Sequence, residues 1–180
     1  MFIGRRLAVE NMAKTDSFFI RTSATSTAGN FNQETIDLGA YVDALGKSVL
    51  RIHNISVQTL SNSTMGEDWS IPANTQSNLS WQLTTQSQSD LVDATDKSVV
   101  STGRLDIANE SSTAGYTFLS NDSGILPQQF TQGYLVAVES MYLGIKTDSQ
   151  IAQADVVLVM ECTVETLSQN AAVALALSQQ

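Results

Sequence analysis

The sequence predicts an all-β fold: eight strands arranged as a β-sandwich of two sheets. Segments with alternating apolar and polar residues, or rich in β-branched and aromatic residues, recur along the 180-residue chain. Charged residues make up only 15% of the sequence, so Ser, Thr, Asn and Gln replace the Lys and Glu that helical surfaces favour. Hydrophobic residues make up 42%, which is enough for one domain with a proper core.

Eight segments are expected to form strands, and stretches dense in turn-forming residues separate them. The longest of these polar stretches are residues 61–78 and 108–117. The expected strands are residues 17–23, 31–38, 47–60, 79–86, 97–107, 115–120, 134–146 and 155–167.

The last two segments show how the sheets should be buried. Segment 155–167 has the clearest two-residue period, so one face should meet the core and the other should face solvent. Segment 134–146 is apolar on both faces and should be one central strand, or a strand whose outer face meets another subunit. In 155–167 the expected inward residues are Val156, Leu158, Met160, Cys162 and Val164, and the expected outward residues are Asp155, Glu161, Thr163 and Glu165.

Helix signals are few. Residues 40–45 could form about one turn, and residues 88–96 could form a short helix capped by Ser89 or Asp90. The Ala- and Leu-rich tail is uncharged and favours a helix. We expect one domain, 1–180, made of an N-terminal arm (1–15), a β-sandwich (16–168) and a C-terminal tail (169–180).

Among two-sheet sandwiches the single jelly roll, with extended termini, is the leading choice, because folding the sheet into two layers deals with its exposed edges. An immunoglobulin-like sandwich would suit the strand pattern equally, but the Cys…Trp…Cys spacing is missing. Cys162 is the only cysteine, so no intrachain disulfide is expected.

The charge of the chain limits its partners. Nine basic residues stand against 18 acidic ones, for a net charge of −9. The acidic body should repel nucleic acid, so no direct nucleic-acid binding is expected. No apolar run approaches the ~20 residues of a membrane span. Residues 1–16 lack the apolar core of a secretion signal, which favours assembly inside a cell.

Two motif fragments suggest nucleotide chemistry, and both fail on context. Gly46-Lys47-Ser48 ends like a phosphate-binding loop, but the first glycine of that loop is replaced by Tyr41 and a strand-like segment follows. Tyr142 and Lys146 have the Y-x-x-x-K spacing of short-chain dehydrogenases, but they lie on an expected strand and no G-x-G-x-x-G precedes them. We expect no nucleotide at Lys47.

Isolated chemical groups give no catalytic or metal site. His53 should share a strand face with Val49, Ile55 and Val57, and a His53–Cys162 pair is disfavoured because Cys162 should lie in the core. With no G-x-S-x-G either, we expect no enzyme, cofactor or small-molecule substrate. On a helix, Asp90, Asp93 and Asp96 would line one face and could hold Ca²⁺, although a solvated face is favoured.

Sequons and tryptophans complete the candidates. Five N-x-[ST] sequons occur; Asn54 should lie in mid-strand, whereas the three in predicted loops could carry glycans. Trp81 should pack in the core, and Trp69 should anchor its loop or fill a partner's pocket. The sequons are at Asn54, Asn62, Asn78, Asn109 and Asn121, of which Asn62, Asn109 and Asn121 are the loop positions.

The chain resembles the single jelly-roll coat proteins of icosahedral viruses, of the kind found in tailless double-stranded DNA viruses with two small major capsid proteins. The residues that carry the resemblance are MFIGRRLAVENMAKTDSFFI at the N-terminus, the eight strand segments, and the late apolar pair YLVAVESMYLGI and ADVVLVMECTV. It implies a structural capsid protein that self-assembles through subunit contacts and exchanged terminal arms. The implied partners are copies of itself and other capsid proteins, in a virion assembled in the host cell cytoplasm.

Both termini carry apolar residues that a monomer would leave in water. Exposed apolar patches usually mark contact surfaces, so at least one arm should pack on a neighbouring subunit. Deleting 1–15 or 169–180 should then leave a folded domain that assembles poorly. The alternative function is a surface-exposed carbohydrate-binding or adhesive β-sandwich, which needs a concave aromatic cluster or loop carboxylates around Ca²⁺.

Overall fold

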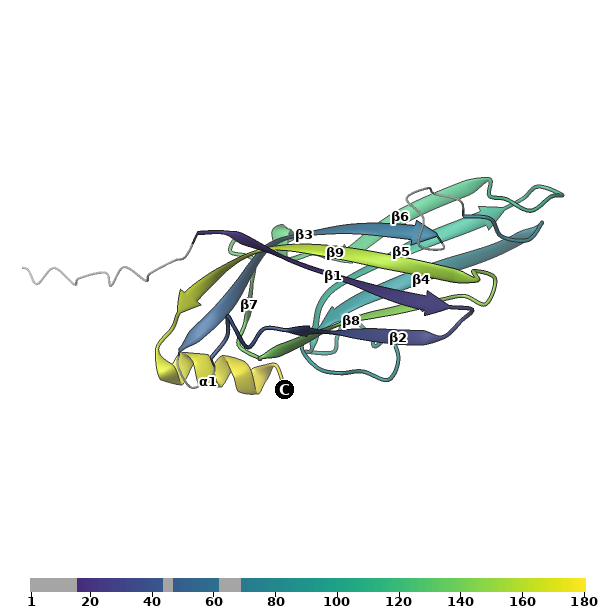
Figure 1. The fold of residues 1–180 in the computed structure, drawn as a ribbon. Helices are drawn as coiled ribbons and strands as arrows, with labels where there is room; N and C mark the ends of the chain where they lie inside the picture. Colours follow the sequence, from purple (N-terminus) through teal and green to yellow (C-terminus); the bar gives the residue numbers. More distant parts are fainter. Residues whose placement is uncertain (1–15, 44–46, 62–68) are drawn as a thin grey trace, which may run out of the picture.

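A computed structural model of the chain describes residues 16–43, 47–61 and 69–180. These residues form nine strands, one 3₁₀ turn and one α-helix, arranged as two antiparallel sheets packed face to face (Figure 1). The elements are β1 (Phe18–Thr27), β2 (Phe31–Asp37), β3 (Ser48–Ser61), β4 (Thr75–Thr84), β5 (Val99–Asn109), β6 (Phe118–Ile125), η1 (Pro127–Gln129), β7 (Tyr134–Val136), β8 (Ser140–Thr147), β9 (Gln153–Thr166) and α1 (Gln169–Ser178).

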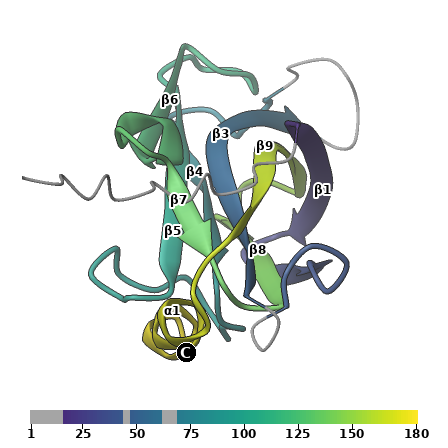
Figure 2. The ribbon, with the colours of Figure 1, turned by 90° about the vertical axis from the view of Figure 1, so that its left-hand side faces the viewer.

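The strand order is that of a jelly roll. One sheet has the order β1-β9-β3-β7 and the other β2-β8-β4-β5-β6. When β6 is set aside, the first strand pairs with the last, the second with the second-last, and so on inward to the β4–β5 hairpin. A long hairpin wrapped into two layers gives this pattern, and Figure 2 shows the layers end-on. The predicted two-sheet sandwich is confirmed, with nine strands rather than eight.

The expected single strand 134–146 is two strands in different sheets. β7 pairs with β3, whereas β8 lies between β2 and β4. The strand breaks at Ala137–Glu139, where the Ala137 N–H donates to the Gln179 side chain instead of to a neighbouring strand. The prediction of one central strand was therefore wrong for β7, which is an edge strand.

The strand count rises from eight to nine because 134–146 forms two strands, whereas the segment predicted at 115–120 forms one strand, β6. It begins at Phe118, continues to Ile125, and pairs with β5 only. β6 therefore lies outside the first-with-last pairing of the other eight strands, and it widens the second sheet to five strands.

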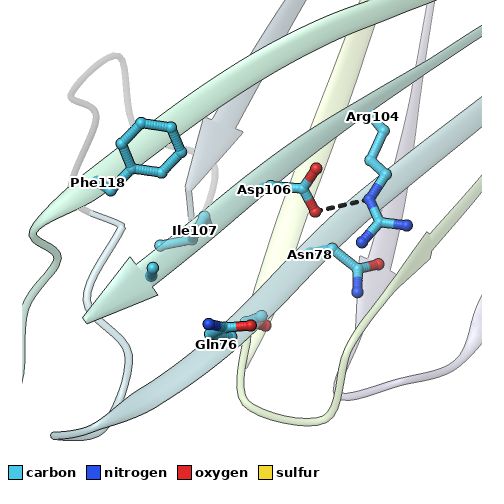
Figure 3. Close-up of a pocket in the computed structure, with 8 residues that line it drawn as sticks. Gln76, Asn78, Arg104, Asp106, Ile107 and Phe118 are labelled. Carbon is cyan, nitrogen blue, oxygen red and sulfur yellow. Dashed lines mark hydrogen bonds and ion pairs between the residues drawn. The ribbon is translucent and has the colours of Figure 1, made fainter. Parts of the chain in front are cut away.

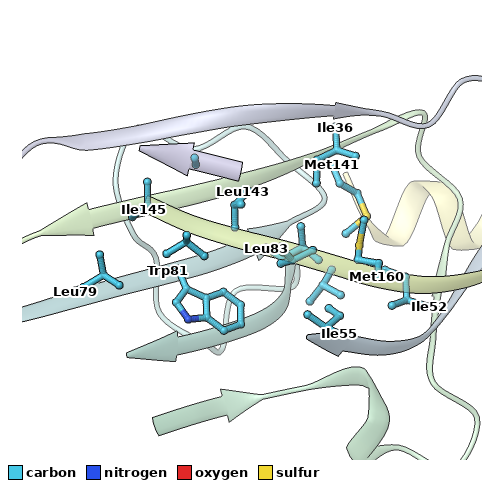
Figure 4. Packing of buried hydrophobic residues seen from close by; sticks show 14 of the residues in the cluster. Ile36, Ile52, Ile55, Leu79, Trp81, Leu83, Met141, Leu143, Ile145 and Met160 are labelled. Atoms are coloured by element: carbon cyan, nitrogen blue, oxygen red, sulfur yellow. The ribbon is translucent and has the colours of Figure 1, made fainter. Parts of the chain in front are cut away.

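The core lies between the two sheets and takes its side chains from both (Figure 4). Trp81 is the largest side chain that β4 contributes to this core. The indole ring lies over Gly103 on β5, where an added Cβ atom would come within 2.5 Å of the ring. Trp69 is also 2% exposed, so it anchors its loop in this core and does not fill a partner's pocket. Cys162 lies in the core as predicted, and burial raises the pKa of its thiol to about 12.

The outer face of β9 is less wet than its alternation predicts. Val156, Leu158, Met160 and Cys162 are buried and Val164 is half-buried, as expected for the inner face. On the other face, however, Asp155, Thr163 and Glu165 are also buried. Each has a polar partner from a neighbouring strand: Thr25 Oγ1 donates to Asp155, Thr163 contacts His53, and Arg51 pairs with Glu165.

A β-bulge changes the face of β3 at its histidine. The register with β9 shifts between Ile52 and Asn54, so Ile52 and Ile55 both point into the core. His53 therefore does not share a face with Ile55, contrary to the prediction. Alongside β3, beyond the point where β7 begins at Tyr134, the Gln128 side chain bonds both the N–H and the C=O of Ile55, as a neighbouring strand would.

Of the three helices that the sequence favours, only the tail forms one. In 40–45, residues 44–46 lie outside the described residues, and 40–43 form a turn that ends in a bridge from Asp43 to Ser48. Residues 88–96 are a loop, because Asp90, Asp93 and Asp96 each accept a hydrogen bond from a backbone N–H one or two residues ahead. Such side-chain bonds compete with helix formation.

Asn109 fixes the loops at the far end of the sandwich from α1. Its side-chain amide donates to the carbonyls of Ile71, Pro72 and Thr113, and its oxygen accepts from Ser111. Asn109 is the last residue of β5 and not a loop residue, and its side chain is buried, so it is a poor candidate for carrying a glycan.

We expect Asn109→Asp to lower the free energy of unfolding by about 2–4 kcal/mol, because it removes both donors and buries a charge. Asn121→Asp is the matched control, since Asn121 is an exposed sequon on β6 and should change stability by less than ~0.5 kcal/mol. Urea denaturation measures both. Equal losses for the two variants would show that the Asn109 bonds do not hold the loops.

Candidate interaction surface

The chemical groups that the sequence singled out do not converge. His53 Nε2 lies 2.9 Å from Thr163 Oγ1 on the outer face of its sheet, whereas Cys162 points into the core. Lys47 occupies a turn with a φ of 77° and leads directly into β3, not into a helix. Lys146 lies on β8 and bonds Asp90, so the Y-x-x-x-K spacing is on a strand.

The three aspartates of 88–96 stabilise their own loop. A hydrogen bond from Lys146 lowers the pKa of Asp90, and backbone bonds from Thr95 and Ser98 lower the pKa values of Asp93 and Asp96. Across residues 16–43, 47–61 and 69–180, no three His, Cys, Asp or Glu side chains gather in a way that could hold a metal ion. In the same ranges no helix is long and apolar enough to span a bilayer.

The three other sequons within the described residues lie on strands. Asn54 is exposed in the middle of β3, as predicted, and Asn78 is half-exposed on β4. Asn121 is exposed on β6 and not in a loop, because this strand continues past its predicted end at 120 to Ile125. Asn62 lies outside the described residues.

The C-terminal helix is anchored to the sandwich of its own chain. Ser168 caps its first turn by accepting from the Ala171 N–H. Ala172 and Ala176 are buried against Val49 and Ala137 in a small second core outside the main one. The tail 169–180 is thus packed on the domain and is not a free arm in this structure.

Gln179 locks the end of this helix in place. Its side chain accepts from the Ala137 N–H at 2.9 Å and donates to the Leu135 carbonyl at 2.7 Å. Its own carbonyl accepts from the hydroxyl of Thr85, the residue that follows β4 of the other sheet. The residue is 3% exposed, so one glutamine near the C-terminus joins α1 to both sheets.

The side of α1 that faces away from the domain exposes a row of apolar side chains, beside the polar Asn170 and Ser178. We call this row of side chains the α1 ridge. The exposed fraction of Leu177 is 64%, and no charged residue lies anywhere in the helix. Since 3.6 residues make a turn, this row is on the face opposite Ala172 and Ala176. The α1 ridge consists of Ala171, Val173, Ala174 and Leu177.

Other exposed apolar side chains lie on elements that begin or end near α1. Phe19 is at the start of β1, which pairs with the last part of β9, and Arg21 lies over its ring. Tyr41 stacks on Phe18 with ring centroids 4.7 Å apart. Phe130 lies just before β7 and is exposed as well. Figure 1 shows that β1 begins and β9 ends on the side of the sandwich that carries α1.

Comparisons with known proteins assign the chain to no family. No protein-family model matches the sequence, and no curated protein matches it. Among solved structures, one chain from the atomic structure of Sulfolobus Turreted Icosahedral Virus is similar over 87% of this chain, at 15% identity and a TM-score of 0.38. This chain covers 32% of that chain's length.

Proposed function

We propose that the chain is a structural capsid protein that self-assembles into an icosahedral shell. The observation that carries the proposal is the α1 ridge: an uncharged apolar row held outward by a helix whose other face is fixed to the domain. A monomer gains nothing from presenting Leu177 to water, whereas a contact with another copy would bury it.

The fold supports the same role. Jelly rolls serve as shell-forming domains as well as lectins and cupins, so the fold alone does not decide between these functions. The described residues bring together no metal-ligand cluster of the cupin type. A jelly roll whose C-terminal helix is fixed to the domain and carries exposed apolar side chains is suited to lateral contacts between copies.

Terminal exchange is part of the proposal only at the N-terminus. The tail packs on its own domain through Gln179, Ala172 and Ala176, so exchanging it would break these contacts. Residues 1–15 carry Phe2, Ile3, Leu7, Val9 and Met12, and we assign the exchanged arm to them. The partners are copies of this chain and other capsid proteins, located in a virion assembled in the host cell cytoplasm. With a net charge of −9, no direct genome contact is proposed.

The assembly test uses Val173→Asn combined with Leu177→Gln. Both positions are exposed, so the variant should fold, but the polar side chains should weaken the contact between copies. We expect the full chain to form oligomers of defined size by light scattering, and the double variant to need at least ~10-fold more protein to do so. Tyr116→Ser, at the opposite end of the sandwich, is the matched control and should assemble like the full chain.

Two results would contradict the proposal. A monomeric full chain at every accessible concentration would exclude self-assembly. Unchanged assembly of the double variant would show that the α1 ridge is not the contact surface.

A further inference from the structure

The outer face of the five-stranded sheet has a shallow depression of about 270 Å³ near the far end of the sandwich from α1. Figure 3 shows it between Phe118 on β6 and the amide side chains of Gln76 and Asn78 on β4, with Arg104 and Asp106 of β5 beside them. None of these residues belongs to the α1 ridge.

The strand register explains why a hollow forms here. Gln76 is opposite Ala108 on β5, and Ala108 is opposite Phe118 on β6. Side chains that are opposite one another on neighbouring strands point to the same side of the sheet. A long amide and an aromatic ring therefore flank a single methyl group, and the step in length between them makes the depression.

Its polar groups are available to a ligand. Within the described residues, the amides of Gln76 and Asn78 make no side-chain hydrogen bond. Arg104 Nε bonds Asp106 Oδ1 at 2.6 Å, which leaves the outer guanidinium nitrogens and the second carboxylate oxygen to bond elsewhere. Ser77 lies between Gln76 and Asn78 and is opposite the core residue Ile107, so its buried hydroxyl points to the inner face of the sheet and is not one of these groups.

The ring beside these groups is unusually open. Phe118 has an exposed fraction of 60%, one of the highest values for a large apolar side chain in the described residues. Its face carries the negative side of the ring quadrupole and attracts polarised C–H groups. A pyranose offers such C–H groups on one face and hydroxyls around its rim.

We propose that this depression binds a neutral hexopyranose unit of a glycan, with the sugar stacked on Phe118 and its hydroxyls bonded by Gln76, Asn78 and the Arg104–Asp106 pair. Amides and a charge pair both donate and accept, which is what a ring of hydroxyl groups needs. The site would give a shell protein a means of attaching to a glycosylated surface. It does not depend on the proposed assembly.

The charged side chains around the depression favour a neutral sugar over an anionic one. Arg104 is already paired with Asp106, and Asp122 on β6 is directly opposite Arg104, so no unpaired cation is left for an anionic sugar or a phosphate. A volume of 270 Å³ lies just below the ~300 Å³ at which sites for drug-sized ligands begin, and it suits one sugar ring. A single exposed ring should bind weakly, with a Kd on the order of 1–10 mM.

A second depression, of about 350 Å³, continues the site along the same sheet face. Arg104 lines both depressions, and the loop residues Leu91 and Val92 wall the second. A disaccharide should therefore bind more tightly than a single sugar.

The test is an NMR titration of the full chain with the methyl glycosides of glucose, galactose and mannose, followed by lactose and maltose. Saturable shifts should appear at the amides of residues 76–78, 104–108 and 118 with at least one neutral sugar. Phe118→Ala should weaken binding at least ~10-fold, since the stacking surface is lost. Tyr116→Ala is the matched control, because Tyr116 is an exposed aromatic residue that does not line the depression. Thermal melting of each variant confirms that it is folded.

Several outcomes would overturn this site. They are no saturable shift up to ~50 mM of any of these sugars, equal binding by Phe118→Ala and the full chain, or, in a parallel titration with a sialoside, binding of the sialoside alone. If Phe118→Ala instead reduces assembly in light scattering without any sugar effect, the face is a contact between copies. The assembly variant Val173→Asn/Leu177→Gln should keep the sugar shifts, so failure of one proposal is distinguishable from failure of the other.

Discussion

Glu165→Ala should lower the free energy of unfolding by about 3–5 kcal/mol, the usual cost of removing one partner of a buried ion pair. Arg51 Nε and Nη2 each bond a carboxylate oxygen of Glu165 at 2.7 Å, and the Glu165 side chain is fully buried. The guanidinium also donates to the Gln132 carbonyl, which ties the pair to the loop before β7. Without the carboxylate, a nearly buried positive charge loses its counter-charge.

Urea denaturation of three variants separates this effect from a general loss of charge. Asp106→Ala removes the exposed Arg104–Asp106 pair and should cost less than ~1 kcal/mol. Arg51→Met combined with Glu165→Leu replaces both charges with apolar side chains and should recover most of the loss. A cost below ~1 kcal/mol for Glu165→Ala would mean that the pair is effectively solvated.

Deletion of 169–180 should destabilise the domain by roughly 3 kcal/mol or more, because it uncovers an apolar cluster and removes hydrogen bonds from buried groups. Val49 and Ala137 lose the cover of α1, and the Ala137 N–H and Leu135 carbonyl lose Gln179. This differs from the expectation drawn from the sequence, where the tail was an arm that could be removed without unfolding the domain.

Gln179→Ala gives a graded version of the same test. It keeps the helix but removes the bonds of the Gln179 side chain, and it should cost about 1–3 kcal/mol. Thermal melting followed by circular dichroism measures both variants, with Ser178→Ala as a control at an exposed neighbour. A deletion variant that melts within a few degrees of the full chain would show that α1 adds no stability.

The sequence predicts the strands well wherever one face is buried and the other is wet. It does not predict the break between β7 and β8, because Tyr134–Val136 and Ser140–Thr147 are apolar on both sides and the pattern continues without interruption. The break depends on Gln179, a residue more than 40 positions away that takes the Ala137 N–H. A local sequence pattern cannot predict a hydrogen bond to a residue so far along the chain.

Local side-chain bonds explain two further differences. The three-residue spacing of Asp90, Asp93 and Asp96 suits a helix, but each carboxylate bonds a nearby backbone N–H and holds a loop instead. On β3, alternation alone puts His53 with Ile55, and only the bulge separates them.

The α1 ridge can be predicted in part from the sequence, whereas the depression beside Phe118 cannot. Ala171–Leu177 is conspicuous as an uncharged apolar run, but either side of such a helix could have been the buried one. The Phe118 depression has no sequence signal, because it depends on the register that brings Gln76, Ala108 and Phe118 side by side across three strands. That register follows from the fold.

Cryo-electron microscopy of the full chain at high protein concentration tests the central claim most directly. The proposed function predicts closed particles in which α1 of one copy lies at the boundary with the next, with Val173 and Leu177 in the contact. Single isolated domains under all conditions, or particles in which α1 faces solvent, would contradict it.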